Sequence, residues 1–97
     1  MTTYIMLINW TEQGARNLRE SPKRLDAAKK ELEAMGGVFK EFYMTMGEYD
    51  MVAVCEAPDD AVFARFGLTM GMKGNVRTRT LKAFSESAFR ELIATVS

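Results

Sequence analysis

The side chains best suited to chemistry are four polar residues that interrupt apolar segments, namely Asn9, Tyr43, Asp50 and Arg77. An amide, a phenol, a carboxylate and a guanidinium can orient a small molecule, and a phenol or a carboxylate can also move a proton. We expect them to share one face of a sheet, provided that the last strand has the phase that turns Arg77 toward the others. A structural interpretation stays open, in which Asp50 bonds to its own hairpin and Arg77 pairs with it across the sheet or across a dimer interface.

Several chemistries lack the residue types that they need. The sequence contains no histidine, which removes Ser–His triads and the commonest transition-metal ligand, so we predict no metal site and no cofactor. The glycines form neither the dinucleotide fingerprint nor the Walker pattern. Cys55 is the only cysteine; we interpret it as a buried core thiol, and the absence of a disulfide partner favours the reducing cytoplasm.

Composition and charge indicate one globular domain that spans residues 1–97. Of these residues 47% are hydrophobic and 27% are charged, and 13 basic side chains balance 13 acidic ones. Such a balance disfavours binding to nucleic acids or to an anionic membrane, because no excess positive field exists. The apolar N-terminal run is too short to cross a bilayer and lacks a basic leader. The basic residues Arg79 and Lys82 are interpreted as protection of an edge strand.

Hydrophobic periodicity and turn residues predict seven elements in the order strand, helix, strand, strand, helix, strand, helix. Ser21-Pro22 starts the first helix, and Gly47 supplies the positive φ of a tight hairpin turn. Two βαβ units joined by that hairpin make a ferredoxin-like α+β fold, in which helices cover one face of a four-stranded antiparallel sheet. The expected ranges are 3–10, 21–36, 38–46, 49–57, 58–72 and 75–84, with a C-terminal helix after Ser85.

The sheet is expected to be apolar on both faces. In the first strand Ile5 and Leu7 alternate with other apolar residues, and in the third strand Val52 and Val54 do the same. A sheet with helices on one side only should alternate apolar with polar residues. We therefore predict that a second copy of the chain covers the other face, so that the protein is at least a dimer. By alternation Asn9, Glu41, Tyr43 and Asp50 lie on this second face.

Three segments carry a resemblance to a known family. The stretches Gly47-Glu48-Tyr49-Asp50-Met51-Val52, Glu56-Ala57-Pro58-Asp59 and Gly74 to Leu81 resemble the GYD domain family, with Glu48 inserted between the glycine and the tyrosine of its motif. The resemblance implies a dimeric α+β barrel, in which two ferredoxin-like sheets pack face to face. It implies no particular reaction, because fold does not determine chemistry.

Two functions fit these expectations. The first is a homo-oligomeric binding or assembly module with a mostly apolar cavity between the packed sheets, which holds a small apolar or aromatic ligand. The alternative is a cofactor-free enzyme in which Asp50 or Tyr43 moves a proton during isomerisation, decarboxylation or oxygenation. The lack of histidine favours the binding module.

Overall fold

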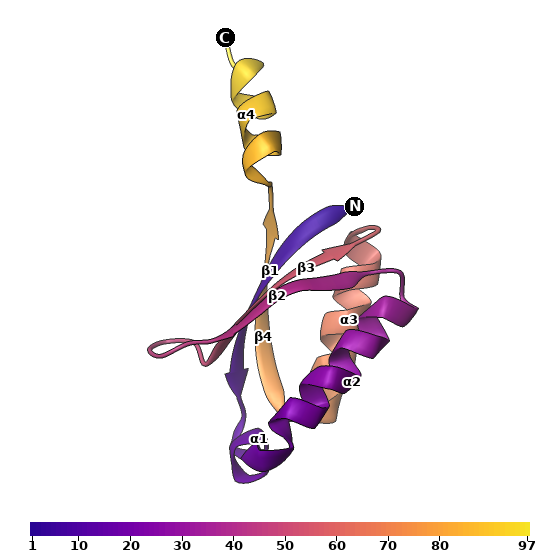
Figure 1. Cartoon of the computed structure of the whole chain (residues 1–97), viewed down its shortest axis with the longest axis vertical. Coiled ribbons are helices and arrows are strands. Elements are labelled where there is room, and N and C mark those ends of the chain that lie inside the picture. The colour runs from indigo at the N-terminus through magenta and orange to yellow at the C-terminus, as the bar shows by residue number, and fades with distance from the viewer.

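The computed structural model describes all 97 residues and confirms the predicted α+β fold (Figure 1). The short helix Glu12–Arg16 is not expected from the sequence, because the polar, glycine-containing stretch Thr11-Glu12-Gln13-Gly14 is typical of a loop. The hairpin connection is also longer than the predicted two residues. The elements are β1 (Thr2–Trp10), α1 (Glu12–Arg16), the 3₁₀ turn η1 (Leu18–Glu20), α2 (Ser21–Ala34), β2 (Val38–Met44), β3 (Met51–Ala57), α3 (Asp60–Lys73), β4 (Val76–Ala83) and α4 (Glu86–Ala94).

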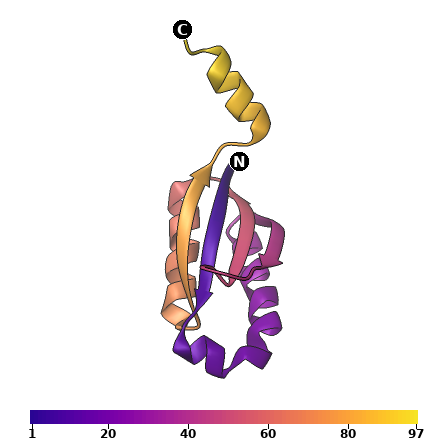
Figure 2. The same ribbon diagram turned by 90° about the vertical axis from the view of Figure 1, so that its left-hand side faces the viewer.

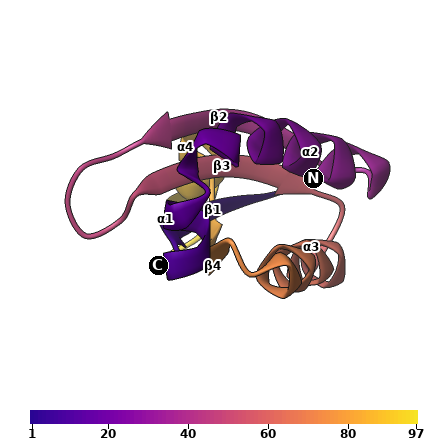
Figure 3. The same ribbon diagram turned by 90° about the horizontal axis from the view of Figure 1, so that it is seen from below.

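The four strands form one sheet in the order β2-β3-β1-β4, and every neighbouring pair is antiparallel. Helices α2 and α3 lie on the same side of this sheet, whereas α4 stands beyond its end (Figures 1 and 2). The view from below shows α2 beside β2 and α3 beside the other edge (Figure 3). Because α2 and α3 share one side and α4 stands beyond the end, the opposite side of the sheet has no cover from the chain itself. None of the helices is long and apolar enough to cross a membrane.

The core lies between the sheet and the two helices. Tyr4 of β1 stacks on Phe63 of α3 with ring centroids 4.4 Å apart and an interplanar angle of 2°. Alternate residues of β1 and β3 point into this layer, as the sequence predicts. The core members are Tyr4, Met6, Ile8, Ala28, Leu32, Met51, Ala53, Cys55, Ala57, Phe63, Phe66 and Met70.

Helix α3 begins and ends with caps that its sequence specifies. The Asp59 side chain accepts a hydrogen bond from the Val62 N–H at 2.9 Å, and Gly74 ends the helix with a φ of +78°. The apolar residues of α3 suggest burial on two sides, but that expectation is wrong. Leu68 and Met72 are exposed, because only the side that faces the sheet is packed.

Cys55 is fully buried on the side of β3 that faces the helices, and burial raises the pKa of its thiol to about 12. The thiolate is the reactive form of cysteine. We therefore expect Ellman's reagent to leave the native protein unmodified at pH 8 and to modify one thiol per chain in denaturing urea. Rapid reaction in native buffer would show that β3 opens locally.

Candidate functional site on the open face of the sheet

The open face is the side of the sheet that points away from α2 and α3. The register sets Ile5 of β1 opposite both Val54 of β3 and Leu81 of β4, and it sets Leu7 opposite Val52. Leu81 is exposed and the other four are only half-buried, although all five carry aliphatic side chains. They form a continuous apolar patch at the centre of the open face, which agrees with the predicted phase of β1 and β3.

The four polar residues predicted from the sequence surround this patch. Arg77 pairs with Asn9 between β4 and β1, and Tyr43 pairs with Val52 between β2 and β3. Asp50 comes directly before β3 and donates its N–H to the Ile8 carbonyl at 3.0 Å. The strand register thus resolves the phase of β4 and places Arg77 on the open face with the others.

Asp50 and Asn9 hold the end of β1 to the hairpin. The Trp10 N–H donates to Asp50 Oδ2 at 3.0 Å, and the Asp50 N–H donates to Asn9 Oδ1 at 3.0 Å. Within one chain, Arg77 belongs to none of the five ion pairs, so it does not pair with Asp50 across the sheet. The Asp50 carboxylate therefore accepts a hydrogen bond from the backbone N–H of Trp10 and not from the guanidinium of Arg77. The alternative, a pairing across a dimer interface, stays a prediction.

Tyr43 lies on the exposed edge strand β2, and its hydroxyl donates to Glu41 Oε2 at 3.2 Å. The negative charge of Glu41, together with this hydrogen bond, raises the pKa of the phenol. A phenol with a raised pKa stays protonated near neutral pH and so is a poor proton acceptor. The exposed Tyr43 side chain can form hydrogen bonds through its hydroxyl and apolar contacts through its ring.

The basic stretch after α3 divides between the two faces of the sheet. Arg77 and Arg79 are exposed on the open face, whereas Lys82 bonds to Asp60 Oδ2 at 3.0 Å beside the helices. Asp60 also accepts a hydrogen bond of 2.6 Å from the Tyr4 hydroxyl. That bond, followed by the contact with Lys82, lowers the pKa of the Asp60 carboxyl. Lys82 thus joins β4 to α3 and does more than protect a strand edge.

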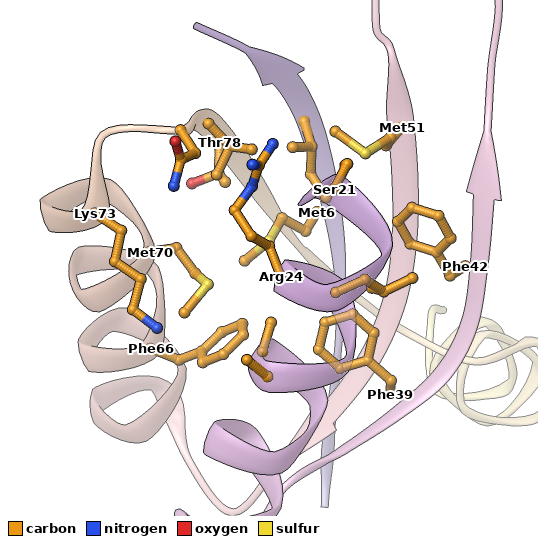
Figure 4. A pocket seen from close by; sticks show the side chains of 16 residues that line it. Met6, Ser21, Arg24, Phe39, Phe42, Met51, Phe66, Met70, Lys73 and Thr78 are labelled. Atoms are coloured by element: carbon orange, nitrogen blue, oxygen red, sulfur yellow. The ribbon is translucent and has the colours of Figure 1, made fainter. Parts of the chain in front are cut away.

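A cavity of about 130 Å³ lies on the other side of the sheet, between α2, α3 and the strands (Figure 4). Its walls are mainly apolar and include Phe39, Phe42, Phe66 and Met70. At the rim, Arg24 donates to the Asn17 carbonyl at 2.9 Å and Lys73 pairs with Glu31. Sequence reasoning missed this cavity; the small residues Ala27 and Ala28 of α2, which line it, are the signal that could have indicated a gap.

Substitution of Asp50 separates its structural role from a role in binding. Asp50→Ala removes the acceptor of the Trp10 N–H and is expected to lower the free energy of unfolding by about 1–3 kcal/mol. Asp50→Asn keeps an oxygen in place, so we expect less than about 1 kcal/mol. Urea denaturation measures both, with the exposed hairpin variant Glu48→Ala as the control. An Asp50→Asn protein that keeps its stability but loses a ligand would show that the carboxylate binds.

Comparison with known proteins agrees with this architecture. A protein from Thermus thermophilus, named glutamine synthetase and cystathionine beta-lyase binding protein, is 40% identical over 84 residues, which cover 86% of this chain and 88% of that protein. A hypothetical protein from Pyrococcus horikoshii has a similar crystal structure, with a TM-score of 0.56 and 23% identity over 89% of this chain and 93% of that one. A second crystal structure, also from Thermus thermophilus, has a TM-score of 0.54 and 24% identity over 88% of this chain and 95% of that one.

The two similar crystal structures establish the fold of the chain. The match of its sequence to a family model establishes the family. The model of the GYD domain matches residues 4–93, which include every strand residue that carries the apolar patch and its polar surround. The chain belongs to the GYD domain family.

Proposed function

We propose that this chain is a homo-oligomeric binding module that assembles through the open face of its sheet and acts in the cytoplasm. The observation that carries this proposal is the apolar patch of Ile5, Leu7, Val52, Val54 and Leu81, which no element of the same chain covers. A contiguous apolar patch on one face of a small domain marks a contact surface. An identical sheet offers a surface of the same shape and polarity, so two copies can cover each other about a twofold axis.

Sedimentation velocity between about 1 and 100 μM tests the assembly. We expect a dimer or a larger closed oligomer over most of this range, with dissociation on dilution. A folded monomer at every concentration would contradict the proposal, because the apolar patch would then be stable in water. The measurement uses the unmodified chain and requires no knowledge of a ligand.

The proposed partners outside the oligomer are metabolic enzymes. Support comes from the Thermus thermophilus relative, whose name describes binding to glutamine synthetase and cystathionine beta-lyase. Purified glutamine synthetase and cystathionine beta-lyase from the same organism as this chain, immobilised separately in biolayer interferometry, test this directly. Binding of the oligomer to at least one enzyme, but not to immobilised albumin, is expected. Absence of binding to both would restrict the module to self-assembly and small ligands.

A small apolar or aromatic ligand between the packed sheets is the second proposed role. Assembly would place Asn9, Tyr43, Asp50 and Arg77 beside the apolar patch of the other copy, which gives an apolar space with a few polar groups. The hydrogen bond from the Trp10 N–H occupies an oxygen of the Asp50 carboxylate, and the raised pKa of Tyr43 makes its phenol a poor proton acceptor, so both observations favour binding over proton abstraction. An NMR titration with indole distinguishes the two spaces: shifts at Leu7 and Val52 indicate the open face, and shifts at Phe42 and Met70 indicate the cavity near the helices.

A further inference from the structure

The cavity between the helices and the sheet has an apolar end and a polar end. Phe39 and Phe66 lie at one end, whereas Ser21 and Thr78 lie at the other (Figure 4). The polar lining residues come from the start of α2 and from the segment that runs from the end of α3 into β4; they are Ser21, Arg24, Lys73, Asn75 and Thr78. A ligand that matches this cavity therefore needs an apolar body and a polar head.

The space suits a body about the size of a benzene ring. It measures about 130 Å³, and an apolar cavity of about 150 Å³ is large enough to bind benzene. Methionine side chains are unbranched and flexible, so the lining residues Met6, Met51 and Met70 can adjust to the shape of a ligand. Ala27 and Lys73 also line the cavity and are exposed, so a ligand can enter from solvent between α2 and α3.

The charge of the cavity lining is positive. Arg24 and Lys73 are its two cations, and no acidic residue lines the space. Lys73 pairs with Glu31, which lies outside the lining, whereas Arg24 belongs to none of the five ion pairs. The guanidinium of Arg24 is therefore the charge that an anionic head group can neutralise.

Backbone carbonyls before α2 hold the Arg24 side chain in place. Its Nη1 donates to the Asn17 carbonyl at 2.9 Å and its Nη2 donates to the Gly14 carbonyl at 3.3 Å, and its remaining N–H groups have no partner in the chain. Gly14 packs directly on the carbonyl of Asn75, which brings the guanidinium near Asn75. An oriented guanidinium with free N–H groups is well suited to a carboxylate, which can accept two of them at once.

We propose that this cavity binds a small carboxylate with an aromatic or branched aliphatic body. The body lies against Phe66, Met6 and Met70, and the carboxylate accepts hydrogen bonds from Arg24 and from the side-chain amide of Asn75. A mainly apolar space with one charge-assisted contact is typical of small-molecule sites. The site lies on the helix side of the sheet, so it requires neither the open face nor the assembly of copies.

Sodium benzoate is the probe, and methionines with isotopically labelled methyl groups are the NMR reporters. We expect a titration to shift the methyl signals of Met6, Met51 and Met70 with a dissociation constant of about 1 mM or tighter. Met46 and Met72 are exposed and lie outside the lining, so their signals serve as internal references. If about 20 mM benzoate shifts none of the three lining methionines, the site does not exist.

Two related compounds separate the parts of the ligand. Benzyl alcohol keeps the ring but lacks the charge, and we expect it to bind at least tenfold more weakly than benzoate. Acetate keeps the charge but lacks the ring, so about 20 mM acetate should shift none of the lining methionines. Benzyl alcohol that binds as tightly as benzoate would contradict the role assigned to the carboxylate.

Arg24→Gln tests the charged contact. We expect its affinity for benzoate to fall at least tenfold and its affinity for benzyl alcohol to change less than threefold, which also shows that the cavity is intact. Arg19→Gln removes an exposed charge outside the lining and should keep the affinity for benzoate within threefold. Equal affinity of the two variants for benzoate would overturn the proposal.

Ala28→Leu tests the place of the ligand, because Ala28 lines the cavity and a larger side chain there occupies the space. We expect the benzoate-induced shifts to disappear. Ala34→Leu, at an exposed position of the same helix outside the lining, should leave them unchanged. Circular dichroism verifies that both variants are folded. A folded Ala28→Leu protein that binds benzoate as tightly as the Ala34→Leu protein would show that the ligand does not occupy this cavity.

Discussion

Replacing Gly14 with alanine is expected to lower the free energy of unfolding by about 3 kcal/mol or more, because the new methyl group has no room. A Cβ on Gly14 would lie 2.0 Å from the carbonyl oxygen of Asn75. That carbonyl accepts from the Thr11 N–H at 3.0 Å, and the Thr11 hydroxyl donates to the Gly74 carbonyl at 2.6 Å. The backbone of 74–75 cannot retreat without breaking the bonds that join it to the start of α1.

Gly67→Ala is the matched control for Gly14→Ala. A Cβ at Gly67 meets no atom within 4 Å, and Gly67 lies inside α3. Alanine should therefore stabilise the chain by about 0.5–1 kcal/mol through helix propensity. Urea denaturation at 25 °C measures both variants. Equal stability of the Gly14→Ala and unmodified proteins would mean that α1 and the loop before β4 are not packed as described.

Ile5→Lys is expected to separate the proposed oligomer into folded monomers. Ile5 lies at the centre of the apolar patch, opposite Val54 and Leu81, and a lysine there would leave an unpaired charge in a contact that excludes water. Loss of about 3 kcal/mol or more would raise the dissociation constant by at least about 100-fold. The chain should still fold, because Ile5 points away from the core.

Met46→Lys controls for the added charge in the Ile5→Lys experiment. Met46 is 95% exposed in the connection between β2 and β3, so its replacement should leave sedimentation unchanged. Light scattering and sedimentation velocity at 10 μM compare the two variants. If Ile5→Lys remains as oligomeric as the Met46→Lys protein, the copies meet through another surface and the open face has a different partner.

The faces of the sheet could be predicted because alternation is a strong signal in β1 and β3. Every second residue is buried from Tyr4 to Ile8 in β1 and throughout β3, and the intervening aliphatic residues are only half-buried. The two βαβ units then leave few ways to arrange four strands. For the same reason Asn9, Tyr43 and Asp50 could be assigned to one face before any contact was known. Arg77 could not, because the sequence leaves the phase of β4 open, and only the pairing of Arg77 with Asn9 places it on that face.

The contacts of these side chains could not be predicted, because they depend on backbone positions that the sequence does not show. The carboxylate of Asp50 accepts from a main-chain N–H, that of Trp10, and any residue type could provide that donor. Strand β2 gives another example. Phe39 and Phe42 are three residues apart, so strict alternation puts them on opposite faces. A bulge between Phe39 and Glu41 lets both phenylalanines line the cavity near the helices.

The order of strands in the sheet also has a consequence for the rate of folding. The hairpin of β2 and β3 joins neighbours in sequence, but Thr2 pairs with Ala57 and Trp10 with Val76. Closing such long loops costs entropy before the pairings contribute, which slows the folding of sheets with distant partners. Until β1 enters between β3 and β4, both of those strands expose unpaired edges beside apolar side chains. Refolding yield should therefore fall steeply with protein concentration, because aggregation competes with the pairing of β1 between β3 and β4.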